Sequence, residues 1–595
     1  MPTLSSPPSF AETTLLIAPR PAPRALWKPK TSVLPADEFI ARQAGVSPVA
    51  AALLRLRGYE SVASISAFLE PSPSLLRDPA LLPDIGLAVA RLVQALERRE
   101  KILIFGDYDA DGVTSTALLV RCLRLLRADV HWRLPERDEG YGLNSNVMRD
   151  AHAQGFHLVM SADCGIRDVE AAQTARELGL DLIITDHHEP GVELPECVAV
   201  VNPKRADSRY GFGGLSGCGV AFKVMQALLL AYKPEALDSF SEKYLDLVAL
   251  STIADCVPLC DENRYLTAAG LHSLYGTRKK GLRALIEAAG PKDSSRRDKG
   301  YFVGRDISWG LAPRLNAAGR LASPTLALEL LLCDDEIRAY DLAQRLNVIN
   351  AQRKGDQEIA LRSAMQMVEQ ESNLDRDVLL VAAHSSWHRG IVGLIAGKLV
   401  EKYHRPAFAF NVHDGHAHGS GRSVADFNLH DLLEATRPHF TRGGGHAAAC
   451  GLTLPEANIG IFRAAAQEWA GSHLSVADLR PIVCPDCEVE AAHLTPQLVT
   501  ELARLEPCGT GNEEPKFLLR GARVESIRTL SMGKHLEVTL RGDGKRLRAL
   551  WWQNGDKLGD FRVGDPVEVV FVPKINDYMG KNEVELTIDD ARVMI

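Results

Sequence analysis

The feature that most constrains this fold is a regular alternation of short apolar runs with amphipathic segments between Lys101 and Asp186. The apolar runs have the length and residue types of β-strands, and the segments between them have helical periodicity. The expected strands are Ile102–Phe105, Ala128–Leu134, Leu158–Ser161 and Leu182–Thr185. The expected helices include Thr114–Leu126 and Arg167–Leu178. This alternation predicts βαβ units and a parallel sheet, whose carboxyl edge is the usual place for ligands.

At 595 residues the chain is too long for one hydrophobic core. The proline-rich first 35 residues are expected to form an extended arm, either laid on a later domain or mobile. A helical lead-in follows, and after the sheet a mainly helical connector carries polar loops at Pro291–Gly304 and Ala312–Ser323. A second α/β segment begins at Val378–Ala383 and continues through helix Gly390–Glu401 and strand Ala407–Phe410. Short strands after Ile482 predict a small β-barrel.

The expected fold class is therefore multidomain α/β with a C-terminal all-β domain. The expected boundaries are 1–98 for the arm and lead-in, 99–260 for the sheet domain, 261–370 for the connector, 371–475 for the second α/β domain and 476–595 for the barrel.

Composition excludes several classes of protein. Apolar residues make up 46% and charged residues 24%, as in ordinary globular proteins. The apolar runs fall well short of the roughly 20 residues that span a bilayer, and the eleven cysteines lack the spacing of a disulfide framework. The pair Cys484 and Cys487 is weak evidence for zinc or redox chemistry because no second pair accompanies it. We expect a cytoplasmic protein without membrane contact, whose net charge of −8 argues against coating nucleic acid by bulk charge.

Polar clusters follow the ends of several expected strands. Asp107, Asp109 and Asp111 follow the first strand, at alternate positions flanked by glycines. Alone, this segment is also compatible with an acidic helix-capping turn. Three further clusters occur later, at Asp163-Cys-Gly165, Asp186-His187-His188 and Asp255. Carboxylates and histidines gathered from several strand ends predict a centre for divalent metal ions, and two such ions suit hydrolysis of a phosphodiester.

The chain resembles the DHH phosphoesterases and, within them, the RecJ single-stranded-DNA exonucleases. The resemblance rests on GDYDADG at Gly106–Gly112, PERDEGYGL at Pro135–Leu143, ADCG at Ala162–Gly165, TDHHEP at Thr185–Pro190, LSGCGVAFK at Leu215–Lys223, TIADCVPL at Thr252–Leu259, PRLNAAGRL at Pro313–Leu321, WHRGIVG at Trp387–Gly393, GSGRS at Gly419–Ser423, GGGHAAACG at Gly443–Gly451 and LEPCGTGN at Leu505–Asn512. It implies that the second α/β domain is a substrate-binding DHHA1 domain and that the barrel is an OB-fold. Cys218, Cys450 and Cys508 depart from the family's patterns, where Val or Ala, Ala, and Phe are expected.

The resemblance also implies an activity. The expected reaction is stepwise 5′-to-3′ hydrolysis of single-stranded DNA to 5′-mononucleotides, in DNA repair and recombination, with two Mg²⁺ or Mn²⁺ ions. The implied metal ligands are Asp109, Asp111, Asp163, His187 and Asp255, with Asp163 as the bridge and Asp107 as an additional ligand. His188 is expected beside the metals, at the scissile phosphate. We expect a monomer that cooperates with a helicase and a single-stranded-DNA-binding protein.

Candidate DNA contacts lie outside the metal cluster. Glycine-rich turns at Gly419–Ser423 and Gly443–His446 would let backbone N–H groups approach phosphates, and these include Gly444, Gly445 and His446. Ser420 and Arg422, with Arg137, are expected to hold the 5′-terminal phosphate.

Two further groups are candidates for binding the strand. Arg314, Asn316 and Arg320 are expected along the DNA backbone, although helix capping and ion pairing would also explain them. In the barrel, the candidates for base stacking and charge are Phe517, Lys534, His535, Trp551 and Trp552. One of the two adjacent tryptophans is expected in the core, because neighbouring strand residues face opposite ways.

Two other functions fit parts of the sequence. A DHH phosphodiesterase of short oligonucleotides or cyclic dinucleotides would leave the connector and barrel unexplained. A non-catalytic replication scaffold would be expected to have lost metal ligands, yet every expected ligand is present.

Overall fold

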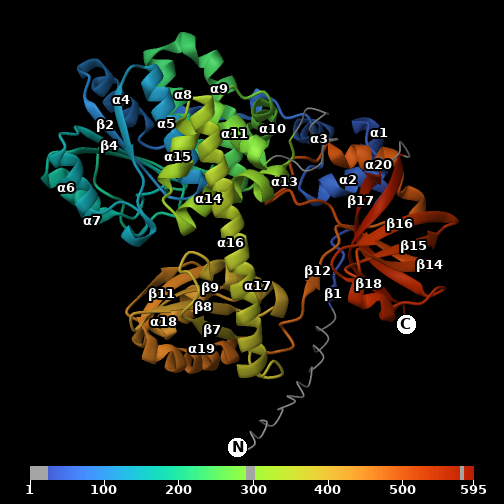
Figure 1. Ribbon diagram of the computed structural model, residues 1–595. Helices are drawn as coiled ribbons and strands as arrows, with labels where there is room; N and C mark the ends of the chain where they lie inside the picture. The colour runs from blue at the N-terminus through green and yellow to red at the C-terminus, as the bar shows by residue number, and fades with distance from the viewer. Residues whose placement is uncertain (1–24, 290–301, 577–581, 595) are drawn as a thin grey trace, which may run out of the picture. The chain divides into compact units, whose positions relative to one another are not determined.

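The computed structural model describes residues 25–289, 302–576 and 582–594 (Figure 1). Its contacts divide the chain into two units. The small unit is formed mainly by residues 363–384 and 393–483, and the large unit holds the remainder from residue 28 onward. Residues 1–24, which include most of the predicted arm, and most of the predicted loop Pro291–Gly304 lie outside the described residues.

A five-stranded parallel sheet forms the centre of the first domain of the large unit. Its strand order is β3 (Asp129–Arg133), β2 (Lys101–Gly106), β4 (Leu158–Ala162), β5 (Asp181–Thr185) and β6 (Ala199–Val201). The four predicted strands are confirmed, and β6 was missed because it has only three residues. Successive residues of β2 alternate between two cores: Ile102 and Ile104 belong to one, Leu103 and Phe105 to the other. The sheet is therefore buried on both faces, as parallel sheets usually are.

Helices supply the two cores on either side of this sheet (Figure 1). One face carries α4 (Ile85–Arg98), α5 (Ala110–Leu125) and α8 (Gly217–Tyr232). The other face carries α6 (Ser145–Ala153) and α7 (Val169–Glu177). Helices α5, α6, α7 and α8 follow strands of this sheet, so the loops that carry the predicted metal ligands meet at its carboxyl edge.

The connector is helical, as predicted, but one expected loop is a helix. It comprises α9 (Leu237–Ala254), α10 (Asp261–Tyr275), α11 (Lys280–Ala289), α13 (Gly304–Asp306), the π-turn η5 (Ile307–Leu311), α14 (Ala312–Leu321), α15 (Thr325–Leu332) and α16 (Glu336–Glu371). The prediction of a polar loop at Ala312–Ser323 is wrong, since α14 occupies it. Pro313 sits in the first turn, where proline is tolerated, and Leu315, Ala317 and Ala318 are buried.

The barrel closes because its first long strand pairs with two other strands, one on each side. Its strand order is β13 (Cys487–Glu488), β14 (Phe517–Leu530), β15 (His535–Gly542), β16 (Lys545–Trp551), β18 (Glu583–Val593) and β17 (Pro566–Asn576), and β14 also pairs with β17. The prediction of short strands that form a small β-barrel after Ile482 is confirmed. The helical lead-in shares this barrel's core, because α2 (Pro48–Leu56), α3 (Val62–Leu69) and α20 (Pro496–Ala503) contribute apolar residues to it. Cys487 is buried in that core, without a disulfide among the described residues.

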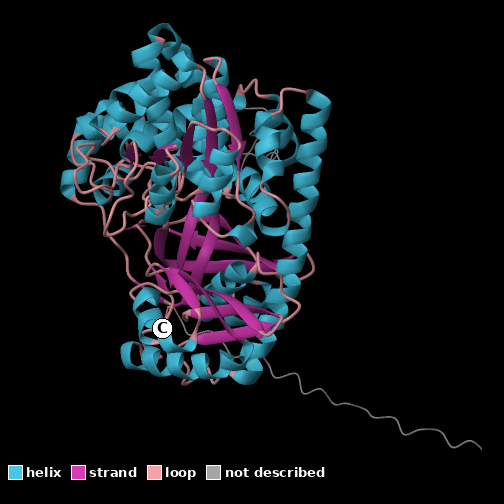
Figure 2. Ribbon diagram, turned by 90° about the vertical axis from the view of Figure 1, so that its left-hand side faces the viewer, coloured by secondary structure: helices cyan, strands magenta, loops and turns pink. Residues whose placement is uncertain are grey.

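The small unit contains a second five-stranded sheet, whose strands Figure 2 draws in magenta. The order is β10 (Arg442–Gly445), β11 (Ala449–Pro455), β9 (His416–Arg422), β8 (Ala407–His413) and β7 (Leu380–His384). The helices of this unit are α17 (Val392–Tyr403), α18 (Leu429–Ala435) and α19 (Ile459–His473). Part of the predicted arm is laid on a later segment as expected, since β1 (Leu26–Trp27) pairs with β12 (Ile482–Val483).

The glycine-rich segments of this unit are strands, which corrects the prediction of glycine turns. Gly419 and Gly421 lie within β9 and face the aromatic core. A Cβ on Gly419 would lie 2.3 Å from Phe410, and one on Gly421 would lie 2.6 Å from Phe408. These glycines are required for close packing against phenylalanine rings and not for turn geometry. Ser420 and Arg422 alternate with them and so belong to the opposite face of the sheet.

No single helix in the part of the chain that the structure describes is long and apolar enough to cross a membrane. The bent pair of helices Pro73–Leu81 and Ile85–Arg98 together has the length and apolar composition of a membrane span, and no other observation supports that role.

Replacing Gly421 with alanine should destabilise the small unit by about 1–3 kcal/mol, because the added methyl group overlaps Phe408 and Cys450. Gly451→Ala in the neighbouring strand is the matched control, because its Cβ would meet nothing closer than 3.8 Å. The free energy of unfolding of both variants is measured by urea unfolding, and the local stability of β8 and β9 is measured by the protection of their amides from hydrogen exchange. Equal protection in the two variants would contradict the packing argument.

Candidate metal centre

The carboxyl edge of the parallel sheet gathers six of the predicted ligands. Three overlapping groups have ligand atoms within 4.8 Å of one another: Asp107 with Asp109 and Asp163, Asp111 with His187 and Asp255, and Asp163 with His187 and His188. Asp163 and His187 each belong to two groups, and of these two only the carboxylate of Asp163 has two oxygens with which to bridge two ions. The structure therefore brings together residues that are up to 148 positions apart, from Asp107 to Asp255.

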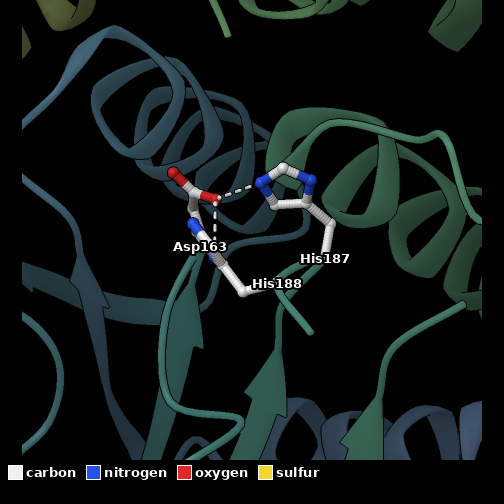
Figure 3. A group of neighbouring side chains, drawn as sticks. All are labelled: Asp163, His187 and His188. Carbon is white, nitrogen blue, oxygen red and sulfur yellow. Dashed lines mark ion pairs between the residues drawn. The ribbon is translucent and has the colours of Figure 1, made fainter. Parts of the chain in front are cut away.

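Asp163 lies at the middle of the cluster (Figure 3). Its Oδ1 lies 3.2 Å from His187 Nε2 and 3.9 Å from His188 Nδ1, and both rings point toward it in Figure 3. The backbone of Asp163 has φ of 67°, a left-handed conformation that is costly for most residues and frequent at functional sites. The backbone is held there by the bond from its N–H to the carbonyl of Thr185 at 3.0 Å.

Asp111 is the most firmly held ligand. Its Oδ2 accepts the N–H of Gly217 at 2.7 Å, and its Oδ1 accepts the N–H of Cys218 at 2.9 Å and the hydroxyl of Ser251 at 2.5 Å. The two amides belong to the first turn of α8, where a carboxylate is favoured by the helix dipole. Sequence reasoning missed this role of the Ser216-Gly217-Cys218 segment. The sequence carries no local signal for it, because the need for glycine comes from the approach of Asp163, from which a Cβ at position 217 would lie 2.5 Å away.

Asp109 and Asp107 come from the turn after β2. Asp109 caps α5 and accepts the N–H groups of Asp111 and Gly112 at 2.8 and 3.1 Å. The capping interpretation of this turn is thus correct as well, and the same carboxylate serves both purposes. Asp107 is 4% exposed, and its Oδ1 has no hydrogen-bond partner among the described residues.

The two histidines have different surroundings. His187 is buried, its Nε2 lies 3.4 Å from Asp255 and 3.8 Å from Asp111, and burial lowers its pKa. Burial also favours neutral His188, but the bond to Asp186 at 2.8 Å more than offsets this and raises the pKa of His188. Asp186 itself accepts the N–H groups of Ile166, His187 and His188. Asp186 therefore orients the histidine turn and is not counted among the ligands. Carboxylates commonly hydrogen-bond to metal-binding histidines in this way and fix the orientation of their rings.

The chemistry of the cluster requires cations. Burial, with the charges of Asp111, Asp109 and Asp107, raises the pKa of Asp163 well above its usual range. Burial, with the charges of Asp111 and Asp109, raises the pKa of Asp255 to about 9. Buried carboxylates at such separations cannot all be ionised unless positive charge is placed between them. Oδ1 of Asp163 and both ring nitrogens of His187 also lack hydrogen-bond partners among the described residues, so the donor set fits hard divalent ions.

Helix α14 supports this centre from the connector. Asn316 Oδ1 accepts the N–H of Ala110 at 2.8 Å, at the start of the helix that carries Asp111. Gly319 approaches the backbone of Tyr108 so closely that a Cβ would lie 2.6 Å from its carbonyl oxygen. Arg137 donates to the carbonyl of Gly319 at 2.8 Å and lies over the Tyr108 ring. Asn316 and Arg137, which are predicted DNA contacts, therefore fix the metal-binding turn together with Gly319.

The other predicted DNA contacts fall into two groups. Arg314 bonds Asn347 and the carbonyl of Gly310 at 3.1 and 2.7 Å, so it ties α14 to the connector. Arg320 donates to the carbonyl of Gly390 at 3.1 Å. In the barrel, Trp551 is 2% exposed and belongs to the core, whereas Trp552 is 48% exposed. Phe517, another predicted stacking residue, is 0% exposed, so neither it nor Trp551 can stack on a base. Strand alternation turns Trp551 inward and leaves Trp552, also a predicted candidate, at the surface.

Comparisons with known proteins agree with this architecture. Three family models match: the DHH family N-terminal domain over residues 101–252, the DHHA1 domain over 376–472 and the RecJ OB domain over 485–590. The fold and the aspartate–histidine centre thus define a DHH-family protein.

Relatives over the whole chain identify the family more narrowly. The single-stranded-DNA-specific exonuclease RecJ of Bacillus subtilis is 36% identical over 93% of this chain and 69% of its own length. The Escherichia coli protein of the same name is 33% identical over 93% of this chain and 97% of its own. The crystal structure of RecJ in complex with Mn²⁺ from Thermus thermophilus matches 96% of this chain and 80% of that chain, with a TM-score of 0.81 and 32% identity. This chain belongs to the RecJ family.

Replacing Asp163 with asparagine should have opposite effects on stability with and without metal. Without metal the variant should melt at a higher temperature than the parent, because a buried carboxylate among like charges is removed. With Mn²⁺ the parent should gain more stability, because the variant lacks the bridging ligand. Differential scanning calorimetry in chelator and in Mn²⁺ measures this, with the exposed Asp341→Asn as control. A parent and variant with equal response to Mn²⁺ would contradict the assignment.

Proposed function

We propose that this chain is an exonuclease that uses two divalent ions, Mn²⁺ or Mg²⁺, to degrade single-stranded DNA from its 5′ end to 5′-mononucleotides in DNA repair and recombination. The observation that carries the proposal is the pair of ligand groups that share Asp163. RecJ relatives are named single-stranded-DNA-specific exonucleases, and RecJ structures hold Mn²⁺ and Mg²⁺. We further propose that it acts in the cytoplasm as a monomer, together with a helicase and a single-stranded-DNA-binding protein.

The residues of the centre divide the work. Two metal ions, when bound, supply a hydroxide nucleophile and offset charge on the phosphate. Asp111 keeps its position through the α8 amides, and Asp163 is shared between the two ligand groups. His188, held by Asp186 and with Tyr141 Oη 3.0 Å from its Nδ1, is positioned to contact a non-bridging phosphate oxygen.

The small unit offers a separate phosphate contact. Ser420 and Arg422 lie on the same face of β9, and both reach Gly393 at the start of α17. A Cβ on Gly393 would lie 2.9 Å from Arg422 Nη2 and 3.5 Å from Ser420 Oγ, so both side chains lie next to this glycine. A hydroxyl, a guanidinium and a helix N-terminus together suit an anion. We propose that these groups bind the 5′-terminal phosphate. Additional contacts to that phosphate from Arg137, Gly444, Gly445 and His446 remain a prediction.

The barrel offers a surface for nucleobases. The exposed Trp552 meets the His535 ring edge-on at 4.8 Å, and Gln553 N–H donates to His535 Nδ1 at 2.9 Å, so the two rings are held in place. Lys534 lies next to His535 in the same hairpin. This combination of aromatic rings and positive charge supports a stacking contact with single-stranded DNA.

End-labelled strands test the proposed activity directly. A single strand labelled at the 5′ end should release labelled mononucleotide at once, whereas a 3′ label should appear last and in the final products. Double-stranded DNA should resist, and chelation should stop all release. Equal release from both ends, or a preference for dinucleotides over long strands, would favour the short-oligonucleotide phosphodiesterase instead.

Replacing Arg422 with alanine should remove the preference for a 5′-phosphate. The loss of a charge-assisted bond predicts a roughly 10–100-fold fall in kcat/KM on 5′-phosphorylated strands and little change on 5′-hydroxyl strands. The exposed Arg376→Ala in the same unit should leave both rates unchanged. Unaltered discrimination by Arg422→Ala in a steady-state assay would reject this contact.

A further inference from the structure

The most exposed of the seven tryptophans lies on a turn that supplies no metal ligand. Trp309 is 71% exposed, compared with 48% for Trp552, 3% for Trp387 and 2% for Trp551. It belongs to η5, a π-helical turn between α13 and α14, which are labelled in Figure 1. π-Helical turns are rare and frequently mark functional sites. An indole left in water on such a turn indicates a role in binding.

The exposure of Trp309 does not come from loose packing of the turn. Ile307 and Leu311, two residues to either side, are 0% and 1% exposed. Leu315 in the next helix is also fully buried. The turn is therefore anchored by its apolar residues, and it presents the indole outward on a rigid support.

Trp309 lies shortly before the residue that holds the metal-binding turn. Arg305, Trp309, Pro313, Asn316 and Arg320 lie three or four residues apart along α13, η5 and α14, and all five are exposed or partly exposed. Asn316 accepts the Ala110 N–H that begins the ligand-bearing helix. Seven residues separate Trp309 from Asn316, which corresponds to about 10 Å along a helix axis.

We propose that Trp309 stacks on a nucleobase of the single strand, on the stretch of DNA that leads to the metal centre. This inference rests on the proposed nuclease function and adds a substrate contact to it. Stacking on an indole is available to every base, which suits degradation without regard to sequence. Arg305, four residues earlier and exposed, adds positive charge for the phosphate backbone.

Steady-state kinetics on a 5′-phosphorylated strand of about 20 nucleotides tests the contact, since that length exceeds the binding sites usual for single-strand proteins. Trp309→Ala should raise KM by about 5–150-fold, the range expected for one lost base stack, and change kcat little. Trp309→Phe should restore most of the affinity, because a phenyl ring also stacks. Tyr340→Ala, which removes another exposed aromatic side chain from the connector, should leave KM unchanged.

A scan with single abasic sites locates the contact. In the parent, KM should rise when one particular nucleobase near the 5′ end is missing, and Trp309→Ala should be insensitive to that same loss. Equal abasic profiles in parent and variant would overturn the inference, even if the parent proves to be a 5′-to-3′ nuclease. Slower hydrolysis of a dinucleotide by Trp309→Phe would also overturn it, by indicating a structural role. A parent that leaves single strands intact would instead reject the proposed function.

Discussion

The structure depends on holding several buried carboxylates within a few ångströms of one another. Such a cluster is unfavourable by itself, because burial and mutual repulsion both oppose ionisation. The fold offsets the cost with fixed donors, of which the four on Asp111 are the clearest: two amides of α8 and the hydroxyls of Ser251 and Ser115. What remains unbalanced, chiefly at Asp163 and Asp255, is the negative charge that divalent cations would neutralise.

The glycines next to the ligand-bearing loops serve this packing more than they serve flexibility. Gly112 lets the turn after β2 fold back on Asp107, where a Cβ would lie 2.5 Å from its carbonyl oxygen. Gly217 lets α8 approach Asp163, and Gly319 lets α14 approach Tyr108. Each glycine marks a place where a second element must come within contact of the ligand-bearing loops. The centre is thus built from three layers: the sheet edge, the helices behind it and the connector helix α14.

The connector has a second role in joining the parts of the large unit. Arg264 on α10 is 1% exposed and donates to the carbonyls of Phe68, Leu505 and Pro507. Burying a guanidinium is costly unless its donors are satisfied, and burial lowers the pKa of Arg264 to about 10. Because those carbonyls belong to the helical lead-in and the segment before the barrel, this one side chain links both to the sheet domain. Hydrogen bonds from one buried guanidinium to three carbonyls tolerate little displacement of those carbonyls. They therefore restrict movement of the lead-in and of the segment before the barrel within the large unit.

The sequence by itself determined the parallel sheet and the barrel strands, because these depend on local periodicity. It also singled out the carboxylates and histidines that the structure brings together, because these polar residues follow strand ends or belong to motifs of a known family. It could not determine which donors hold Asp111, because Gly217 and Ser251 are distant in sequence and look like ordinary helix residues. It misjudged the segment around Arg314 as a loop and the Gly419–Ser423 segment as a turn. In both cases glycine and proline have local preferences that tertiary packing overrides: Gly319 and Gly421 are small because another chain segment lies against them. Only the tertiary structure separated buried Trp551 from exposed Trp552 and brought Trp309 to the surface, since burial depends on neighbours that the local sequence does not specify.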